Sequence, residues 1–156
     1  MIANHGRIGK YDHEFEGRNS RLDGLQAAIL SVKLNYLDEW TSQRIKLADV
    51  YLKELADLDK ITLPVLQPWA NQVYHLFVIR TDRRDALREF LSTKGISTGI
   101  HYPIALPKLP AYRYLIQGDT PTANLIDGSL LSLPIGDHLE LDDAKFVADQ
   151  VKAFFA

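Results

Sequence analysis

One segment near the start of the chain, residues 17–30, constrains the fold more than any other. It reads GRNSRLDGLQAAIL and begins as a turn bounded by glycine. Asn19 and Ser20 are residue types that cap helices, and the apolar spacing predicts a helix over 20–36. A helix that is apolar on two sides needs cover from another element or another subunit. The first apolar stripe holds Leu22, Leu25, Ile29, Val32 and Tyr36, and the second holds Leu30, Leu34 and Leu37.

The remaining apolar patterns predict helices and short strands in one α+β fold. Asp38 can cap a second helix over 39–58, which would form an α-hairpin with the first. The apolar run at 72–80 is typical of a central strand, and Asp82 can cap a helix over 83–94 that Gly95 ends. We therefore expect a small, mostly antiparallel sheet with helices on one face. Other patterns predict strands at 61–68, 96–102 and 130–134, a loop at 103–110, short helices at 110–117 and 121–129, and a C-terminal helix marked by Ala144, Val147, Val151 and Phe154.

The composition excludes several classes of protein. The 156 residues include 18 Lys and Arg and 20 Asp and Glu, which gives a net charge of -2. Nucleic-acid binders usually carry a basic surplus, so we expect no nucleic-acid partner. The chain has no cysteine, which removes disulfides, thiolate nucleophiles and cysteine metal sites and is compatible with the cytoplasmic location that we expect. No apolar run approaches the roughly 20 residues of a membrane span, so no membrane partner is predicted.

Residues 1–19 are polar and have few apolar side chains with which to fold alone. We expect an extended arm or hairpin that lies on another surface. Within this arm, His13, Glu14 and Glu16 have side chains that can ligate a metal. A solvated, charged arm is the favoured interpretation, and no metal site is predicted.

His101 differs from the other histidines because it ends a predicted strand, beside Tyr102. An imidazole and a phenol together can hydrogen-bond a polar ligand. Alternatively, Tyr102 packs against the fold and His101 only caps the strand, and the residues alone favour neither interpretation. His75 is expected to be a satisfied core or edge histidine, and His138 a surface residue in a turn.

Asn19 also has two interpretations. A helix cap fully explains an asparagine just before a helix. In the other interpretation, its amide faces an anion near the helix N-terminus, where the helix dipole favours negative charge. Arg21 either pairs with an acidic neighbour such as Asp23 or helps to hold that anion. The residues alone favour the cap and the ion pair.

Two motifs are specific in combination. The first is G-x-N-x-R-x-D followed by Q-A-A, over residues 17–28, and the second is G-I-H-Y-P, over residues 99–103. With them, nearly the whole chain resembles the DegT/DnrJ/EryC1/StrS family of pyridoxal-phosphate-dependent sugar aminotransferases. The sequence departs from the family pattern at Pro107, where a histidine is often found, and at Arg18, where an aromatic residue is often found. The other matching pieces are VYHLFVIRTDRRDALREFLSTKGISTGIHYP, LPAYRYL and LSLPIGDHLELDDAKFVADQV, in that order.

The resemblance implies the C-terminal part of an enzyme with the aspartate-aminotransferase-like fold. Residues 20–156 would form the small C-terminal domain, and the arm at 1–19 would reach across a dimer interface. The large domain that carries the pyridoxal lysine would be absent from this chain, which would then hold no catalytic residue. The resemblance also implies that Asn19 contacts the cofactor phosphate and that His101 and Tyr102 line the sugar-nucleotide side of the pocket.

The implied reaction moves an amino group, expected to come from glutamate, to a keto-sugar nucleotide during polysaccharide or antibiotic sugar biosynthesis. Pyridoxal 5'-phosphate is the cofactor of the intact enzyme, which is expected to be a homodimer, and the isolated chain is expected to be inactive. Two alternatives stay open. One is a non-catalytic dimerisation or interaction module, which the two-sided apolar helix favours. The other is part of a related pyridoxal-phosphate-dependent sugar dehydratase.

Overall fold

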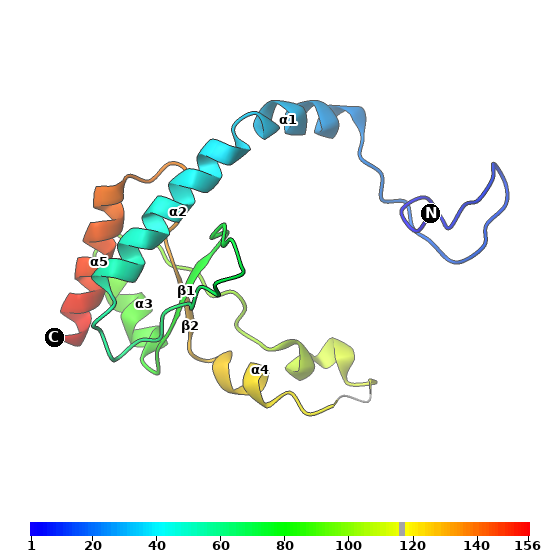
Figure 1. Cartoon of the computed structure of the whole chain (residues 1–156). Coiled ribbons are helices and arrows are strands. Elements are labelled where there is room, and N and C mark those ends of the chain that lie inside the picture. Colours follow the sequence, from blue (N-terminus) through cyan, green and yellow to red (C-terminus); the bar gives the residue numbers. More distant parts are fainter. Residues whose placement is uncertain (116–117) are drawn as a thin grey trace. The chain divides into compact units, whose positions relative to one another are not determined.

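The computed structural model describes residues 1–115 and 118–156. The chain divides into two compact units, Met1–Asp38 and Glu39–Ala156. The cartoon in Figure 1 follows the chain through both units from the N-terminus to the C-terminus. Among the described residues, no helix is both long enough and apolar enough to cross a membrane.

The first unit begins with an arm whose backbone is paired. Isolated antiparallel bridges join Asn4 to Asn19 and Arg7 to His13. The Ser20 N–H donates to the Ala3 carbonyl at 2.9 Å, so the arm stays paired as far as Ser20. Helix α1 follows at Gly24–Leu34.

The predicted cap of the first helix was wrong. The side chain of Asp23, rather than that of Asn19 or Ser20, accepts from the Gln26 N–H at 2.9 Å and caps α1. The physical reason is the pairing of the arm, because a chain held extended to Ser20 enters its helix only after that pairing ends. The anion-binding argument that placed Asn19 at a helix N-terminus therefore does not apply.

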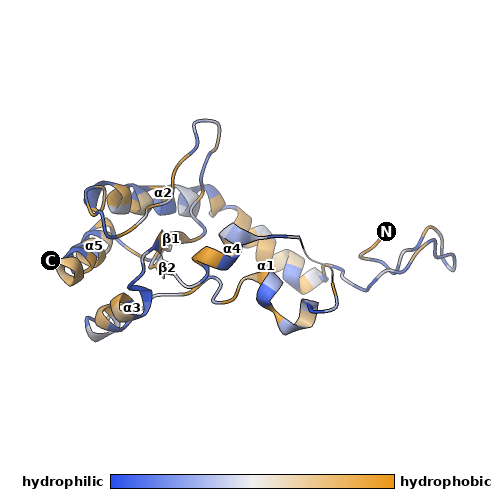
Figure 2. Cartoon of the chain, turned by 90° about the horizontal axis from the view of Figure 1, so that it is seen from below, coloured by the Kyte–Doolittle hydropathy of each residue, from blue (hydrophilic) through white to orange (hydrophobic). Residues whose placement is uncertain are grey.

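Helix α2 spans Leu37–Glu54, so the predicted cap Asp38 lies inside it. The buried side chains of α2, Leu47, Ala48 and Tyr51, lie in its second half. Figure 2 shows apolar and polar residues mixed along α2 and along α5, Leu141–Phe155, as expected of helices that cover a core on one side. A capping box between Glu140 and Asp143 starts α5.

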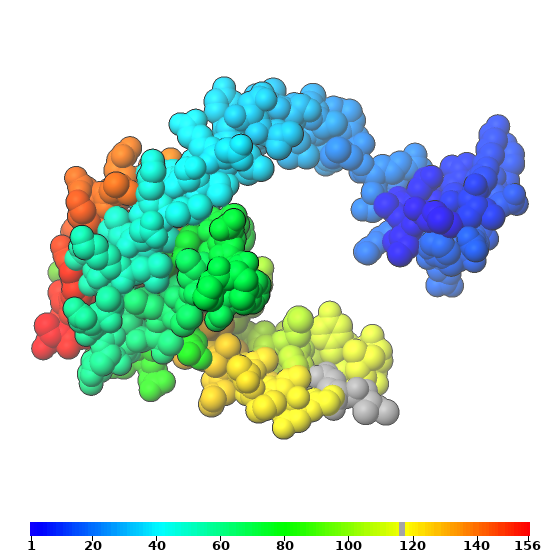
Figure 3. Space-filling view, in the orientation of Figure 1, coloured from blue at the N-terminus to red at the C-terminus, as the bar shows by residue number. Residues whose placement is uncertain are grey.

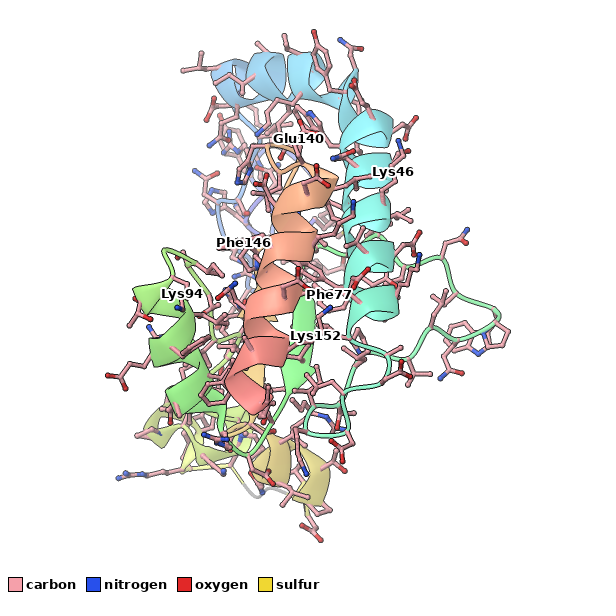
Figure 4. The ribbon with its side chains drawn as sticks, turned by 90° about the vertical axis from the view of Figure 1, so that its left-hand side faces the viewer. Lys46, Phe77, Lys94, Glu140, Phe146 and Lys152 are labelled. Carbon is pink, nitrogen blue, oxygen red and sulfur yellow. The ribbon has the colours of Figure 1, made fainter. Side chains whose placement is uncertain are left out.

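The second unit is built on a two-stranded antiparallel sheet. Strand β1, Phe77–Arg80, pairs with β2, Leu130–Leu133, and the register places Phe77 opposite Leu133. Helices α2, α5 and α3, Arg84–Thr93, cover one face of this sheet (Figures 1 and 4). This is the α+β arrangement that the sequence predicts.

Two predicted strands are reduced to single bridges, and one cap was wrong. The segment at 61–68 pairs only through Thr62 with Arg80, and the segment at 96–102 pairs only through Gly99 with Ser132. Prolines in or just after these segments lack an N–H donor, which favours short pairings.

The predicted cap Asp82 is not used, because α3 begins after Arg83 without a side-chain cap.

Between Gly99 and β2 the chain forms short helical turns. Two 3₁₀ turns span Leu106–Lys108 and Pro110–Tyr112, within the predicted loop and short helix. The last two residues of the predicted helix at 110–117 lie outside the described residues. Helix α4 spans Pro121–Ile126 and is shorter than predicted.

The core of the second unit lies between the sheet and the covering helices. Phe77 of β1 is fully buried, and its ring lies 4.9 Å from the ring of Tyr51 and 6.0 Å from that of Tyr74. Figure 4 shows Phe77 beside α5 and α2. The other fully buried large side chains are Leu47, Leu55, Ile79, Leu87, Leu91, Leu131 and Val151.

Candidate functional site

His101 is held by strand β2 of the second unit. The single bridge between Gly99 and Ser132 brings the GIHYP segment alongside β2, with N–H···O distances of 2.8 and 3.0 Å. The Nδ1 atom of His101 then lies 2.9 Å from the Oγ atom of Ser132, whose residue is only 4% exposed. A buried hydroxyl on the sheet therefore fixes the half-buried imidazole.

Gly99 leaves the space that this imidazole occupies. A Cβ atom at position 99 would lie 2.5 Å from Cε1 of His101 and 3.1 Å from its Nδ1. Such distances are shorter than van der Waals contact, so a side chain here would force the ring to move. The glycine of the GIHYP motif is thus needed for close approach of the ring to the backbone.

Tyr102 is one of the residues that line an apolar groove of about 520 Å³. Its side chain is 74% exposed, and its ring packs edge-on against His101 at 5.7 Å between centroids. The phenol is therefore available to a ligand, unlike a packing tyrosine. The groove is lined by Tyr102, Pro103, Ile104, Ala105, Leu106, Leu109, Ala123, Ile126, Asp127 and Leu130.

One ion pair holds the groove's two walls together. The Nζ atom of Lys108 lies 2.8 Å from Oδ2 of Asp127 and donates to the Asn124 carbonyl at 2.8 Å. Asp127 also accepts from the Ala105 N–H at 3.0 Å. Figure 3 shows the segment that contains residues 103–112 beside α4. The Lys108 hydrogen bond, followed by that of Ala105, holds the pKa of Asp127 below its usual range.

Asn19 belongs to the first unit and is exposed on the arm. Hydrogen bonds on both sides, at Arg18 and at Ser20, hold its backbone in place. Its side-chain amide makes no hydrogen bond with any of the residues that the structure describes. The amide NH₂ is a donor of the kind that an anionic oxygen accepts, so Asn19 fits a contact with a phosphate group.

Carboxylates oppose covalent attachment of pyridoxal phosphate at two of the nine lysines, Lys145 and Lys152. All nine are described, and none is buried. Asp142 raises the pKa of Lys145, and Asp149 with Glu54 raises the pKa of Lys152. Lys152 lies on α5 within 3.0 Å of Glu54 of α2, and Figure 4 labels it there. A Schiff-base lysine must lose its proton, and desolvation or a nearby cation favours that loss, whereas these carboxylates oppose it.

The remaining histidines belong to other segments of the chain. His75 is exposed and precedes β1, so the prediction of a core or edge histidine on this strand was wrong. His138 is an exposed turn residue, as predicted. In the arm, Nδ1 of His13 lies 2.8 Å from the carbonyl of His5. Over residues 1–115 and 118–156, no group of three potential metal ligands is found.

Ser132, Lys108 and Asp127 were not predicted as site residues from the sequence. Ser132 carried one usable signal, because it is the only polar residue in the apolar run LLSLP. A hydroxyl on a buried strand requires a hydrogen-bond partner. The Lys108–Asp127 pair joins residues 19 apart in the sequence, and no local pattern marks it.

Comparisons with known proteins agree with the motifs. The model of the DegT/DnrJ/EryC1/StrS aminotransferase family matches residues 1–152. The erythromycin biosynthesis sensory transduction protein EryC1 of Saccharopolyspora erythraea is 46% identical over 98% of this chain and 42% of its own length. The dTDP-3-amino-3,4,6-trideoxy-alpha-D-glucose transaminase of Streptomyces venezuelae is 46% identical over 97% of this chain and 41% of its own. The chain thus spans about two fifths of these relatives.

A solved structure shares the fold. The crystal structure of Streptomyces venezuelae DesV in complex with a ketimine intermediate matches 99% of this chain and 42% of its own, with a TM-score of 0.86 and 45% identity. The matched part of DesV therefore has the same arrangement of helices around a small antiparallel sheet.

Proposed function

This chain belongs to the DegT/DnrJ/EryC1/StrS aminotransferase family, and from this premise we propose that it is the C-terminal part of an enzyme that transfers an amino group to a keto-sugar nucleotide. The observation that carries the proposal is the family match over residues 1–152, which includes both sequence motifs. The name of the Streptomyces venezuelae relative, a dTDP-amino-sugar transaminase, supports this substrate class. We propose glutamate as the amino donor, which leaves as 2-oxoglutarate when its amino group replaces the sugar keto oxygen.

Pyridoxal 5'-phosphate is the proposed cofactor of the complete enzyme. Once bound, it supplies an electron sink for the bonds that change at the amino carbon. Asn19 would hold its phosphate by donating from the side-chain amide, a role supported by the exposed amide and the fixed backbone on either side. The covalent lysine is proposed to lie in a part of the enzyme outside these 156 residues, and the chain alone is proposed to be inactive.

His101 and Tyr102 are the proposed contacts to the sugar nucleotide. The imidazole is fixed through Nδ1, and the exposed Tyr102, which lines the groove, packs beside it. Each offers a polar atom that can donate to or accept from a sugar hydroxyl or a phosphate oxygen. In this role the two side chains bind and orient the substrate and take no covalent part in the reaction.

We propose further that the complete enzyme is a homodimer and that the arm at residues 1–19 reaches the neighbouring subunit. The exposed apolar side chains of α1 support this assembly. Leu25 is 74% exposed and Leu34 66% exposed. Apolar surface of this extent is usually covered by another domain or chain.

The function is tested with the complete enzyme that contains this chain. It is incubated with pyridoxal phosphate, glutamate and a dTDP-keto-sugar, and 2-oxoglutarate and the amino sugar are measured. We expect equal amounts of both products, and no turnover from the 156 residues alone. Turnover by the 156 residues alone would show that they hold the whole site, and a complete enzyme that forms neither product would refute the proposed reaction.

The role of Asn19 is tested in the same enzyme. Asn19→Ala should weaken retention of pyridoxal phosphate during dialysis by more than it lowers the melting temperature, because the side-chain amide makes no hydrogen bond within the described residues. Asn71→Ala, at an exposed loop position of the second unit, is the matched control and should change neither quantity. If Asn19→Ala lowered stability and retention equally, Asn19 would be a structural residue only.

A further inference from the structure

The two nitrogens of the His101 ring differ in their hydrogen bonding within the described residues. Nδ1 lies 2.9 Å from the Ser132 hydroxyl, whereas Nε2 has no hydrogen-bond partner in the described part of the chain. The hydroxyl belongs to a buried residue of β2, which pairs with β1 on one side and with Gly99 on the other. The anchor of the ring is therefore part of a strand that is paired on both sides.

A serine hydroxyl can hold Nδ1 in either tautomer of the ring. When Nε2 carries the proton, the hydroxyl donates to Nδ1, and when Nδ1 carries the proton, the hydroxyl oxygen accepts from it. The ring orientation stays the same in both cases. Nε2 can then act as donor or acceptor towards a ligand without any movement of the ring.

Gly99 restrains the ring from the backbone side. Because Gly99 has no side chain, the His101 ring can lie close to its backbone. A Cβ atom at position 99 would lie only 2.5 Å from Cε1 of the ring. The Ser132 hydroxyl and the Gly99 backbone thus fix the same ring at neighbouring atoms. Each residue depends on the other, because the bridge between them aligns the hydroxyl with Nδ1.

We propose that Ser132 and Gly99 are positioning residues that hold the His101 imidazole with Nε2 directed to the sugar-nucleotide substrate. This inference rests on the proposed function for the identity of the substrate. The hydrogen bond itself needs no substrate, so the two claims are tested by separate measurements.

The first measurement is histidine-selective ¹⁵N NMR of the complete enzyme, with the His101 signal identified from a His101→Gln variant. Ser132→Ala should change the ¹⁵N shifts of the ring nitrogens, since Nδ1 loses its hydrogen-bond partner and the ring is no longer held. The matched control is Ser129→Ala, which removes a half-buried hydroxyl that donates to the Ile126 carbonyl at 2.8 Å. The control should leave the His101 signals unchanged.

The second measurement is steady-state kinetics. Ser132→Ala should raise KM for the keto-sugar nucleotide about three- to tenfold, the range that one net hydrogen bond gives, with kcat and KM for glutamate nearly unchanged. Ser132→Thr keeps the hydroxyl and should restore most of the affinity. Gly99→Ala displaces the ring directly and should raise KM by at least as much, with its melting temperature recorded alongside.

The outcomes separate the claims. Changed ring shifts together with a raised KM that Ser132→Thr reverses support the proposal. Unchanged shifts in Ser132→Ala, or equal effects in Ser129→Ala, overturn it. Changed shifts with an unchanged KM overturn the substrate-directed part, because the ring would then be held for structure alone. A wild-type enzyme without aminotransferase activity, by contrast, would refute the proposed function before any variant is compared.

Discussion

Tyr51 links helix α2 to the strand that carries Ser132. Its side chain is fully buried, and its ring lies 4.9 Å from that of Phe77. The hydroxyl donates to the carbonyl of Pro134, just beyond the end of β2, at 2.7 Å. Burial, with a smaller contribution from Asp143, raises the pKa of Tyr51 far above its usual value. The hydroxyl therefore remains a protonated donor at any working pH.

Tyr51→Phe keeps the ring and removes only this donor. A neutral hydrogen bond contributes about 1 kcal/mol net, and an acceptor left without a partner adds to the loss when it cannot reach water. Because Pro134 is only half-buried, its carbonyl recovers part of its hydration. We expect the free energy of unfolding to fall by about 1–2 kcal/mol, which lowers the melting temperature by roughly 2–8 °C in a chain of this size.

Tyr74 provides the matched control. It is 4% exposed and also packs on Phe77, at 6.0 Å, but its hydroxyl makes no hydrogen bond with any described residue. Tyr74→Phe should change the free energy of unfolding by less than about 0.5 kcal/mol. Both variants are compared with the wild type by urea denaturation followed by circular dichroism. Equal losses in the two variants would refute the assignment of the stabilisation to the Tyr51–Pro134 hydrogen bond.

Two further predictions concern the second unit. Because the pKa of Asp127 is lowered in the folded chain, its ionised carboxylate stabilises the fold at pH values above the usual aspartate pKa. This stabilisation is lost as the pH falls through the lowered pKa. Asp127→Asn should therefore lower the urea midpoint at neutral pH and flatten its decline as the pH falls below about 4, whereas Asp57→Asn, at an exposed position, should not. Gly95→Ala should cost about 1–2 kcal/mol in the same assay, because Gly95 has a φ of +76°. Gly128→Ala, with open space around it and no positive φ, should cost much less, and equal costs would exclude backbone strain.

The sequence predicted the kinds of element better than their lengths. The apolar run at 72–80 indicated a central strand, yet only Phe77–Arg80 pairs with β2. Strand length is set by the partner, and β2 offers only four residues. Tyr74 also has a positive φ of 48°, which is incompatible with an extended strand. Neither fact is visible in the pattern of one segment.

Helix caps were predicted poorly for a related reason. Asp38 and Asp82 are good capping types, but α2 begins before Asp38 and α3 begins after Arg83. At α1 the pairing of Ser20 with Ala3 decides which acidic or polar residue becomes the cap. A capping side chain acts only where the backbone is free to turn, and the partners that restrict the backbone are distant in sequence.

The residues next to His101 in the sequence do not determine its role. Its position at the end of a predicted strand marked it as either a strand cap or a ligand contact, and the residues alone could not separate the two. The structure joins it to Ser132, 31 residues away, through a hydrogen bond that only the Gly99–Ser132 bridge makes possible. That bond uses one ring nitrogen and leaves the other without a partner in the described chain, so the two interpretations are compatible. An imidazole anchored to a strand is a better ligand contact than a mobile one, since less side-chain entropy is lost when the ligand binds. The hydrogen bond to Ser132 therefore fixes His101 in the fold, and the proposed contact of His101 with the substrate depends on the same hydrogen bond.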